Sequence, residues 1–276
     1  MTHDTSARKR HVCRLPLKSA WACCVRRALD ADPKAEQRGS REPVAISTRT
    51  TLAPAGHMGS FHDATLLASD IALLRDPQSW LNDSCCYLQL EVLRVERAPD
   101  DCVILPPTAA LLLSSCSADE LRVPASPSNL FARCASSALV LLAVTDSTLE
   151  AQALARRATG SHWSLLAAWP KQARAVHYDS MPGAPNAPHA ARLAHALGLL
   201  CNTRFALDLQ GACARQRNAY DCGAHMLANA AALVEGQDPL THAASAFDVR
   251  AALLERARSL ISTVGAQQQM KPAAVC

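Results

Sequence analysis

The stretch HWSLLAAWPKQARAVHYDS, residues 162–180, holds two apolar segments of strand length on either side of a proline. Apolar runs this short, bounded by a turn signal, are typical of buried β-strands. The pattern predicts strands over 162–169 and 173–178, joined by the residues PKQ. If Pro170 and Lys171 form the centre of a tight hairpin, His162 lies directly opposite Asp179.

An imidazole that faces a carboxylate is suited to act as a base. Side chains that face each other across two antiparallel strands have Cβ atoms about 5 Å apart. The carboxylate bonds one ring nitrogen, fixes the tautomer and leaves the other nitrogen free to accept a proton. His177 is the rival for this role, but it shares the strand face of Asp179 and cannot sit across from it. His162 is therefore the favoured base, and a buried structural histidine is the alternative reading.

The segment QRNAYDCGAH, residues 216–225, offers a nucleophile in Cys222, at the predicted start of a helix. The unpaired N–H groups and the dipole of a helix N-terminus favour a thiolate there, and a neighbouring imidazolium does the same. Gly223 leaves room for a substrate carbonyl, and Gln216 is a candidate side-chain donor to an oxyanion beside the backbone N–H of Cys222. Two alternatives stay open: an inert buried thiol, or half of a metal site formed by Cys222 and His225, for which the chain has no second half.

The rest of the chain after Met58 has a globular pattern. Strands gather in the middle and helices at both ends, which predicts an α+β fold. The expected elements are a helix over 82–95 that buries Cys86, Leu90 and Leu93, a short strand-or-helix region over 103–120 with a helix after the proline pair, an interior strand over 138–144, a loop over 180–188, a helix over 189–201, a strand over 205–209, a helix from Cys222 closing at Gly236, and a last helix from Phe247 to Val264.

Charge is distributed unevenly along the 276 residues. Residues 1–60 carry 11 Lys or Arg and 5 Asp or Glu, whereas residues 61–276 carry 17 and 19. The near-neutral body argues against nucleic acid as the main ligand. We expect residues 1–60 to be a disordered basic leader, a solvated tail or an upstream extension of the gene model, with an amphipathic organelle-targeting helix over 5–29 and a weak nuclear signal at 8–10 as alternatives.

The twelve cysteines have no C-x2-C spacing of the kind that zinc sites use, and no secretory signal precedes them. A disulfide framework is not expected, and the composition indicates a reducing compartment, the cytoplasm or the nucleus. No apolar run reaches the roughly 20 residues that span a bilayer, so no membrane partner is expected.

Four motifs together resemble the ubiquitin-like-protein proteases, the sentrin- or SUMO-specific family of cysteine peptidases. They are PQSWLND at 77–83, GSHWSLL at 160–166, HYDS at 177–180 and QRNAYDCGAHML at 216–227, and the resemblance covers about residues 66–262. Within the family the chain is most similar to the deneddylase branch, whose single compact domain runs parallel to ASDIALLRDPQSWLND, LVLLAVTDS and HWSLLAAW followed by AVHYDS. We expect the catalytic domain over 61–265 and a flexible tail over 266–276.

The resemblance implies a role for each motif residue. His162 corresponds to the general base, Asp179 to the carboxylate that orients it, Cys222 to the nucleophile and Gln216 to the oxyanion donor. Further implied residues belong to the substrate site: Trp80 and Trp163 match the two indoles that confine a Gly-Gly tail, and Asp83 resembles the acid that pairs with an arginine of the modifier.

The implied fold is an adenain-like α+β cysteine protease core with a central mixed sheet flanked by helices. The implied function is cleavage after the C-terminal Gly-Gly of a ubiquitin-like modifier, in precursors and in lysine conjugates, by a monomer that needs no metal or organic cofactor. Deneddylation is favoured, and a SUMO-specific protease is the runner-up. A non-catalytic binder of such modifiers and an acyltransferase are the alternatives from other classes. The Ala-rich AHMLANAAAL and the unusual segment TLEAQALARRATG depart from the family pattern and leave the preferred modifier open.

Overall fold

The computed structural model describes residues 57–121, 130–148, 160–181 and 183–269. The expected leader over 1–56 lies outside the described residues, as do residues 270–276. The elements in chain order are β1 (His57–Phe61), β2 (Ala64–Leu67), α2 (Ala68–Arg75), α3 (Asp83–Glu96), β3 (Cys102–Leu105), α4 (Pro107–Ser115), α5 (Ala118–Leu121), α6 (Leu130–Ser136), β4 (Leu139–Thr145), β5 (Trp163–Trp169), a 3-10 turn (Pro170–Gln172), β6 (Arg174–Tyr178), α8 (Ala187–Cys201), β7 (Ala206–Asp208), α9 (Cys222–Val234), α10 (Pro239–His242) and α11 (Ala246–Gln269).

A five-stranded mixed sheet in the order β3-β4-β5-β6-β7 forms the centre of the molecule. The pairs β3-β4 and β6-β7 are parallel, whereas β5 is antiparallel to both β4 and β6. Strand β4 is interior, as its uniformly apolar sequence predicts, because both of its faces are covered. Val140 and Leu142 point into one core, and Leu141 and Ala143 into the other.

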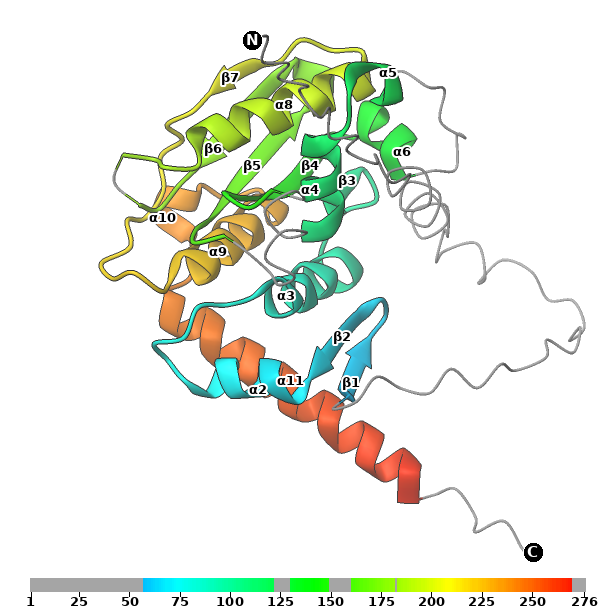
Figure 1. The fold of residues 1–276 in the computed structure, drawn as a ribbon, viewed down its shortest axis with the longest axis vertical. Coiled ribbons are helices and arrows are strands. Elements are labelled where there is room, and N and C mark those ends of the chain that lie inside the picture. The colour runs from blue at the N-terminus through cyan, green and yellow to red at the C-terminus, as the bar shows by residue number, and fades with distance from the viewer. Residues whose placement is uncertain (1–56, 122–129, 149–159, 182, 270–276) are drawn as a thin grey trace, which may run out of the picture.

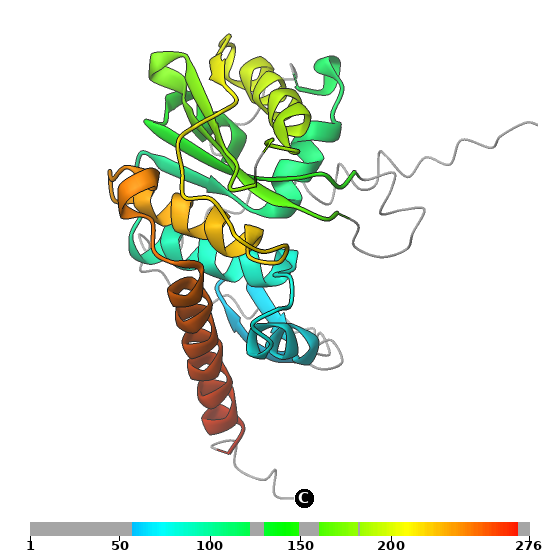
Figure 2. The same cartoon turned by 90° about the vertical axis from the view of Figure 1, so that its left-hand side faces the viewer.

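Two helical layers cover the sheet (Figures 1 and 2). Helices α4, α5, α6 and α8 contribute to the core on one face. Helices α3 and α9 contribute to the core on the other, where α3 buries Cys86, Leu90 and Leu93 as expected. The α+β class with a central mixed sheet flanked by helices is confirmed.

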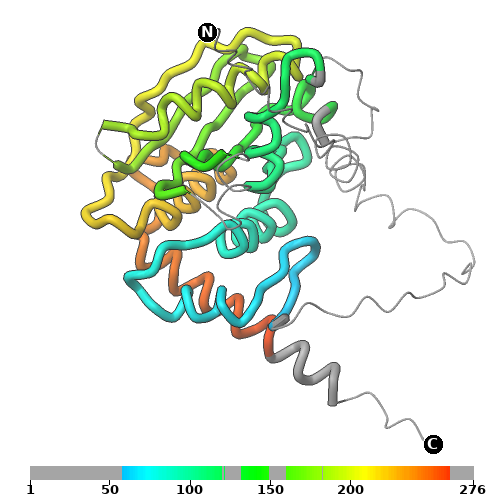
Figure 3. Tube along the Cα trace, in the orientation of Figure 1, coloured from blue at the N-terminus to red at the C-terminus, as the bar shows by residue number. Residues whose placement is uncertain are grey.

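A third layer lies beyond α3 and was not predicted in detail. It consists of the β1-β2 hairpin, α2 and the long helix α11, and Figure 3 shows the hairpin and α11 lying side by side. A Cβ atom at Gly59 of β1 would lie 3.1 Å from the Cβ of Leu260 in α11, so the glycine permits this close approach. The described domain therefore begins before the expected boundary at residue 61, and its last helix continues past 265.

The register of the β5-β6 hairpin differs from the prediction. Trp169 pairs with Arg174 and Leu165 with Tyr178, because the connection consists of the 3-10 turn and of Ala173, whose φ is 50°. The tight turn centred on Pro170 and Lys171 would have paired the strands two residues further along. A slip of two residues keeps every side chain on its expected face, since the side-chain period of a strand is two.

The other predicted elements agree with the structure to within a few residues at their ends. The helix expected over 189–201 begins at Ala187, the strand expected over 205–209 is β7, and α9 begins at Cys222 as predicted. The last helix extends further than expected, over Ala246–Gln269. In the described part of the chain, no helix combines the length and the apolar character that crossing a membrane requires.

Candidate active site

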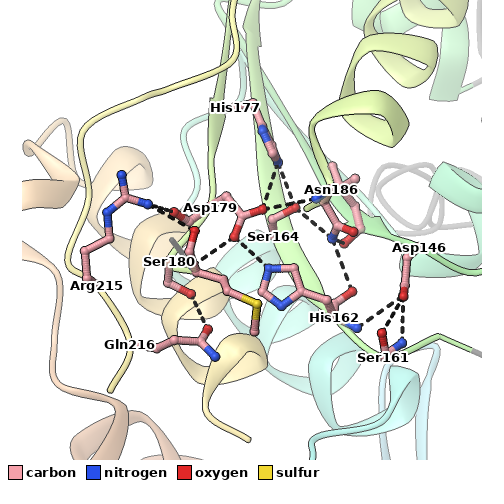
Figure 4. A network of polar contacts seen from close by, with 12 residues as sticks. Asp146, Ser161, His162, Ser164, His177, Asp179, Ser180, Asn186, Arg215 and Gln216 are labelled. Atoms are coloured by element: carbon pink, nitrogen blue, oxygen red, sulfur yellow. Dashed lines mark hydrogen bonds and ion pairs between the residues drawn. The ribbon is translucent and has the colours of Figure 1, made fainter. Parts of the chain in front are cut away.

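His162 and Asp179 meet at the end of the β5-β6 hairpin, as Figure 4 shows. His162 directly precedes β5 and Asp179 directly follows β6. The Nε2 atom of His162 lies 2.6 Å from Oδ1 of Asp179, and both side chains are buried. In the observed register the two residues are diagonal neighbours, a distance that long side chains bridge. The pair forms as predicted, although the register that predicted it was wrong.

Asp179 is held as an anion by several donors. The backbone N–H of Met181 donates to Oδ1 at 3.0 Å, and that of Asn186 donates to Oδ2 at 3.3 Å. Burial alone would raise the pKa of the Asp179 carboxyl, but the hydrogen bonds from His162 and Met181 outweigh burial and lower it. The carboxylate therefore stays ionised beside the imidazole.

The imidazole of His162 has an elevated pKa. Burial acts to lower it, but the bond to Asp179 and the proximity of Cys222 outweigh burial and raise the pKa of His162 to about 9. Nδ1, the ring nitrogen that does not face Asp179, is buried and has no hydrogen-bond partner among the described residues. This arrangement leaves Nδ1 as the ring nitrogen available for proton exchange.

His177 has a different role from that of a base. Its Nε2 atom lies 2.8 Å from the hydroxyl oxygen of Ser164 and 4.0 Å from Oδ2 of Asp179 (Figure 4). The side chain is fully buried, and burial lowers its pKa. The structure therefore agrees with the preference for His162, which has the shorter contact with the carboxylate.

Asn186 forms hydrogen bonds to both His162 and Asp179, a role that was not predicted from the sequence. Its side-chain amide donates to the carbonyl oxygens of Val144 and His162, each at 3.2 Å, and to the hydroxyl oxygen of Ser164 at 3.0 Å. Its backbone N–H donates to Asp179. One buried residue at the start of α8 thus holds both His162 and Asp179 in place (Figure 4).

Asp146 is a second residue that the sequence analysis missed. One of its carboxylate oxygens accepts from the backbone N–H groups of Ser161, at 2.7 Å, and His162, at 3.1 Å, and the other accepts from the Ser161 hydroxyl at 2.6 Å. The carboxylate directly follows β4 and fixes the segment that leads into β5. Because the partners are backbone groups 15 and 16 residues away, no local sequence pattern reveals this role.

Cys222 is the first residue of the 13-residue helix α9 and is 2% exposed. Gly223 follows it, and a Cβ there would lie 3.1 Å from the Cβ of Leu81 and 3.5 Å from the sulfur of Cys86. Leu81 therefore occupies the side on which a side chain at residue 223 would lie, and the room for a substrate carbonyl beside Gly223 stays a prediction. The glycine permits close packing of α9 against the segment that carries Trp80.

Burial disfavours the thiolate form of several other described cysteines. Burial raises the pKa of the Cys85 and Cys102 thiols to about 12, and that of Cys201 to about 11. The cysteines in the described ranges are not joined by disulfides. Within those ranges no group of three or more His, Cys, Asp or Glu side chains is arranged to hold a metal ion, so the alternative metal site at Cys222 and His225 gains no support.

Gln216 is buried and firmly oriented. Its Oε1 atom accepts from the hydroxyl of Ser180 at 2.7 Å, and its Nε2 atom donates to the carbonyl oxygen of Asn218 at 2.8 Å. An amide nitrogen carries two hydrogens, so one N–H of Nε2 remains for another acceptor. Gln216 is absent from the residues that line the pocket at Cys222, and its role as oxyanion donor stays a prediction.

A pocket of about 190 Å³ brings the remaining candidates together. Its walls include Trp80, Asp83, His162, Trp163 and Cys222. Trp80 is 46% exposed, whereas Trp163 is partly buried and its Nε1–H donates to the carbonyl oxygen of Leu81 at 2.9 Å. Asp83 is exposed at the first turn of α3. The two indoles, the acid, His162 and Cys222 therefore line one cavity.

Comparisons with known proteins identify related proteases. The model of the Ulp1 protease family, C-terminal catalytic domain, matches residues 157–258. Sentrin-specific protease 8 of Homo sapiens is 31% identical over 183 residues, which cover 64% of this chain and 80% of that protein. NEDD8-specific protease 1 of Arabidopsis thaliana is 30% identical over 178 residues, with 64% and 74% covered.

Solved structures show the same fold at lower identity. The catalytic domain of the Ulp1-like SUMO protease of Chaetomium thermophilum has a TM-score of 0.55 and 21% identity, with 76% of this chain and 84% of that chain covered. The C-terminal Ulp1 protease domain in complex with the yeast orthologue of SUMO has a TM-score of 0.54 and 17% identity, with 84% and 96% covered. With the fold, the motif order and a 31% identical relative in agreement, the chain belongs to the Ulp1 protease family of cysteine peptidases.

Proposed function

We propose that this protein cleaves after the C-terminal Gly-Gly of a ubiquitin-like modifier, both in precursors and in conjugates to lysine, and that a neddylation-type modifier is preferred. The observation that carries the proposal is the buried His162–Asp179 pair, 2.6 Å apart, which leaves Nδ1 of His162 without a hydrogen-bond partner among the described residues, in a ring whose pKa responds to Cys222. This is the acid–base arrangement that thiol acyl transfer needs.

The chemistry follows from the positions of these groups. The thiolate of Cys222 attacks the carbonyl carbon of the terminal glycine, while its proton resides on Nδ1 of His162. The tetrahedral oxyanion accepts from the backbone N–H of Cys222 and from Gln216. The imidazolium then protonates the leaving amine, and a thioester remains. A water molecule, deprotonated by His162, attacks the thioester and releases the modifier and the thiol.

The pocket walls support a glycine-only tail. Trp80 and Trp163 both line the cavity at Cys222, and two indoles that confine a chain leave room for residues without side chains. The bond from Trp163 to the Leu81 carbonyl fixes one indole, whereas Trp80 is half exposed. We infer that the tail enters between the two rings.

Two observations support a neddylation-type modifier. The curated relatives include a protease named as NEDD8-specific, and Asp83 presents a carboxylate beside Trp80 at the pocket rim. A tail that ends in Arg-Gly-Gly places a cation next to the glycines, whereas SUMO tails have an uncharged polar residue there. An exposed ion pair contributes only about 0 to 1 kcal/mol, but a hydrogen-bonded pair that the complex buries contributes more.

The nucleophile is tested with a vinyl-sulfone derivative of each modifier. We expect one covalent adduct, on Cys222, and no adduct or cleavage with Cys222→Ala. Cys116→Ala is the matched control because Cys116 is a partly exposed thiol outside the pocket, and it should label as the unmodified protein does. Cleavage by the Cys222→Ala protein would overturn the assignment.

The preferred modifier is tested by cleavage rates on neddylation-type, SUMO and ubiquitin substrates in parallel. We expect at least a tenfold preference for the neddylation-type substrate and a loss of most of it in Asp83→Ala. Asp101→Ala, which removes an exposed carboxylate outside the pocket, is the control. A tenfold preference for SUMO, or an Asp83→Ala protein with unchanged rates on every substrate, would contradict this choice.

We further propose that the enzyme acts as a monomer on modifier–lysine conjugates in the cytoplasm or nucleus. Size-exclusion chromatography with light scattering tests the first point, and a mass of twice 29.5 kDa at micromolar concentration would contradict it. Imaging of a fluorescent fusion with and without residues 1–57 tests the second. An organellar signal that depends on those residues would favour the targeting alternative.

A further inference from the structure

Arg250 of α11 is a buried cation that the catalytic scheme above does not use. It is 7% exposed, and its guanidinium makes three directed contacts. Nε donates to Oδ1 of Asp221 at 2.7 Å, and Nη2 donates to the carbonyl oxygens of Ser79 at 2.8 Å and of Tyr220 at 3.0 Å. The side chain thus bonds two separate segments at once.

Those two segments carry the nucleophile and the exposed indole of the pocket. Ser79 directly precedes Trp80, and Asp221 directly precedes Cys222. The two segments are more than 130 residues apart in the chain. Arg250 lies 171 positions from Ser79 and 29 from Asp221, so the last long helix of the domain connects both.

Additional hydrogen bonds fix the segment that contains Ser79 and the segment that contains Asp221. The side-chain amide of Asn218 donates to Oδ2 of Asp221 at 2.7 Å, and the Asn218 carbonyl in turn accepts from Gln216. In the other segment, the Asp76 carboxylate accepts from the Ser79 hydroxyl at 2.6 Å and lies close enough to Arg250 to interact with its charge. Arg250 therefore joins two ordered turns, and a change at Arg250 alters their separation.

We propose that Arg250 is a positioning residue that sets the distance between the indole of Trp80 and the sulfur of Cys222. The inference rests on the proposed function, in which these two groups hold and attack the same Gly-Gly tail. Arginine suits this role because its planar fork reaches a carboxylate and two carbonyls in different directions, whereas a lysine ammonium is one compact donor. Arg250 touches no substrate and is not a catalytic residue.

Arg256 provides a matched control on the same helix. Its Nη2 atom bonds both carboxylate oxygens of Glu96 at 2.7 Å, so it fastens α11 to the end of α3, away from the pocket. Arg250→Met and Arg256→Met each remove one cation that ties α11 to the body. Only the first change releases the segments of Trp80 and Cys222.

The test is steady-state kinetics on a fluorogenic modifier substrate, together with thermal melting of each variant. For Arg250→Met we expect a KM at least tenfold higher, and for Arg256→Met a change below twofold. A purely structural role would lower the folded fraction and hence kcat, with KM unchanged. Equal KM values for Arg250→Met and the unmodified protein would overturn the proposal. If Arg250→Met does not fold, Arg250→Lys replaces it, with an expected threefold or larger rise in KM, and an unchanged KM has the same meaning.

A double-mutant cycle tests the link to the indole. In a Trp80→Ala background, the change at Arg250 should raise KM less than twofold, because the group that it positions is gone. A full tenfold effect in that background would show that Arg250 acts elsewhere.

The rate of iodoacetamide alkylation of Cys222, followed by mass spectrometry of its peptide, needs no modifier. It should fall at least fivefold in Arg250→Met and stay within twofold in Arg256→Met. This measurement separates the proposal for Arg250 from the proposed function. Absence of cleavage on all modifiers would refute the proposed function, and equal alkylation in the two variants would refute the role of Arg250.

Discussion

The imidazole of His162 interacts with two neighbouring groups, the carboxylate of Asp179 and the thiol of Cys222. Burial opposes a charged ring, yet these neighbours outweigh it and raise the pKa of His162 to about 9. The ring of His162 therefore keeps its proton through neutral pH. The same electrostatic arrangement controls both the pH dependence of catalysis and that of stability.

Asp179→Asn should narrow the range of pH in which the enzyme is active. With the carboxylate present, activity falls on the alkaline side as the imidazolium of His162 loses its proton near pH 9. In Asp179→Asn the carboxylate that raises the pKa of His162 is gone, whereas burial still lowers this pKa. The alkaline limb of the activity profile therefore moves to lower pH. We expect kcat to fall about 100-fold or more, because the ring also loses the bond that fixes its tautomer. The profile of kcat against pH is the measurement.

Asp208→Asn is the control for that experiment, because Asp208 is an exposed carboxylate at the end of β7 whose side chain accepts from the backbone N–H of Gln210. Its profile should match that of the unmodified protein. An alkaline limb that stays in place in Asp179→Asn would show that Asp179 does not control the protonation of His162.

His162 should stabilise the fold most strongly at neutral and acidic pH. A folded-state pKa above the unfolded value of 6.5 means that the folded protein binds the proton more tightly. This contribution is fully present below about pH 6.5 and is lost as the pH rises through about 9. Urea unfolding of the unmodified protein and of His162→Gln should therefore give a difference in unfolding free energy that shrinks between pH 6.5 and 9.5. A difference in unfolding free energy that is constant or grows over this range would contradict the raised pKa of His162 in the folded protein.

The sequence predicts the central residues of the site better than those that support them. His162 and Asp179 lie at the ends of a recognisable hairpin, and the alternation of side chains places them on one face whichever register the turn selects. Asn186, Asp146 and Arg250 act through bonds to backbone groups of distant segments. A single polar side chain in a loop or helix carries no periodic signal, so only the folded chain shows these roles.

At the scale of elements, turn geometry was the least predictable feature. The β5-β6 connection contains Ala173 in the left-handed region, a conformation that its sequence does not announce. The β1-β2 hairpin is short, and its turn uses His62 at a φ of 49° rather than a glycine or asparagine. The long helices and the fully apolar strand β4 were predictable because burial imposes their pattern.

Asn186→Ala tests how strongly the start of α8 is tied to strands β4 and β5. The change leaves the carbonyls of Val144 and His162 and the hydroxyl of Ser164 without the amide donor at a fully buried position. The two amide hydrogens are shared among these three acceptors, and each unmade buried hydrogen bond costs about 1 to 3 kcal/mol, so we expect a loss of about 2 to 6 kcal/mol in unfolding free energy. We also expect kcat to fall about tenfold, because the backbone of His162 is released.

The control for Asn186→Ala is His195→Ala, which alters an exposed residue of the same helix and should change neither quantity. The two variants are compared by urea unfolding and by turnover of the folded protein. Asn186→Ala with the stability and kcat of His195→Ala would show that the amide network does not hold the site.

At the scale of the whole molecule, the pocket lies where separate layers meet. His162 and Asp179 come from the sheet, Trp80 from the segment between α2 and α3, and Cys222 from α9. Helix α11 lies against β1, α2, α3 and α9, so it braces the layer that carries Cys222 against the segment that carries Trp80. Stability of this outer layer is therefore expected to influence the pocket, although none of its strands lines it.

The boundary of the functional domain follows from the same packing. Strand β1 begins at His57, and Met58 and Phe61 pack against the core, with Arg256 of α11 placed over the Phe61 ring at 5.4 Å. A protein that starts at Met58 keeps these contacts and should retain kcat/KM within twofold. A protein that starts at Asp63 loses β1 and with it the side chains of Met58 and Phe61. Loss of such a partly buried apolar pair costs about 1 to 3 kcal/mol of unfolding free energy. Each kcal/mol should lower the melting temperature by about 2 to 4 °C. If the protein that starts at Met58 melts normally but turns over much more slowly, residues 1–57 belong to the substrate site. If the protein that starts at Asp63 melts as the full chain does, the β1–α11 contact does not stabilise the domain.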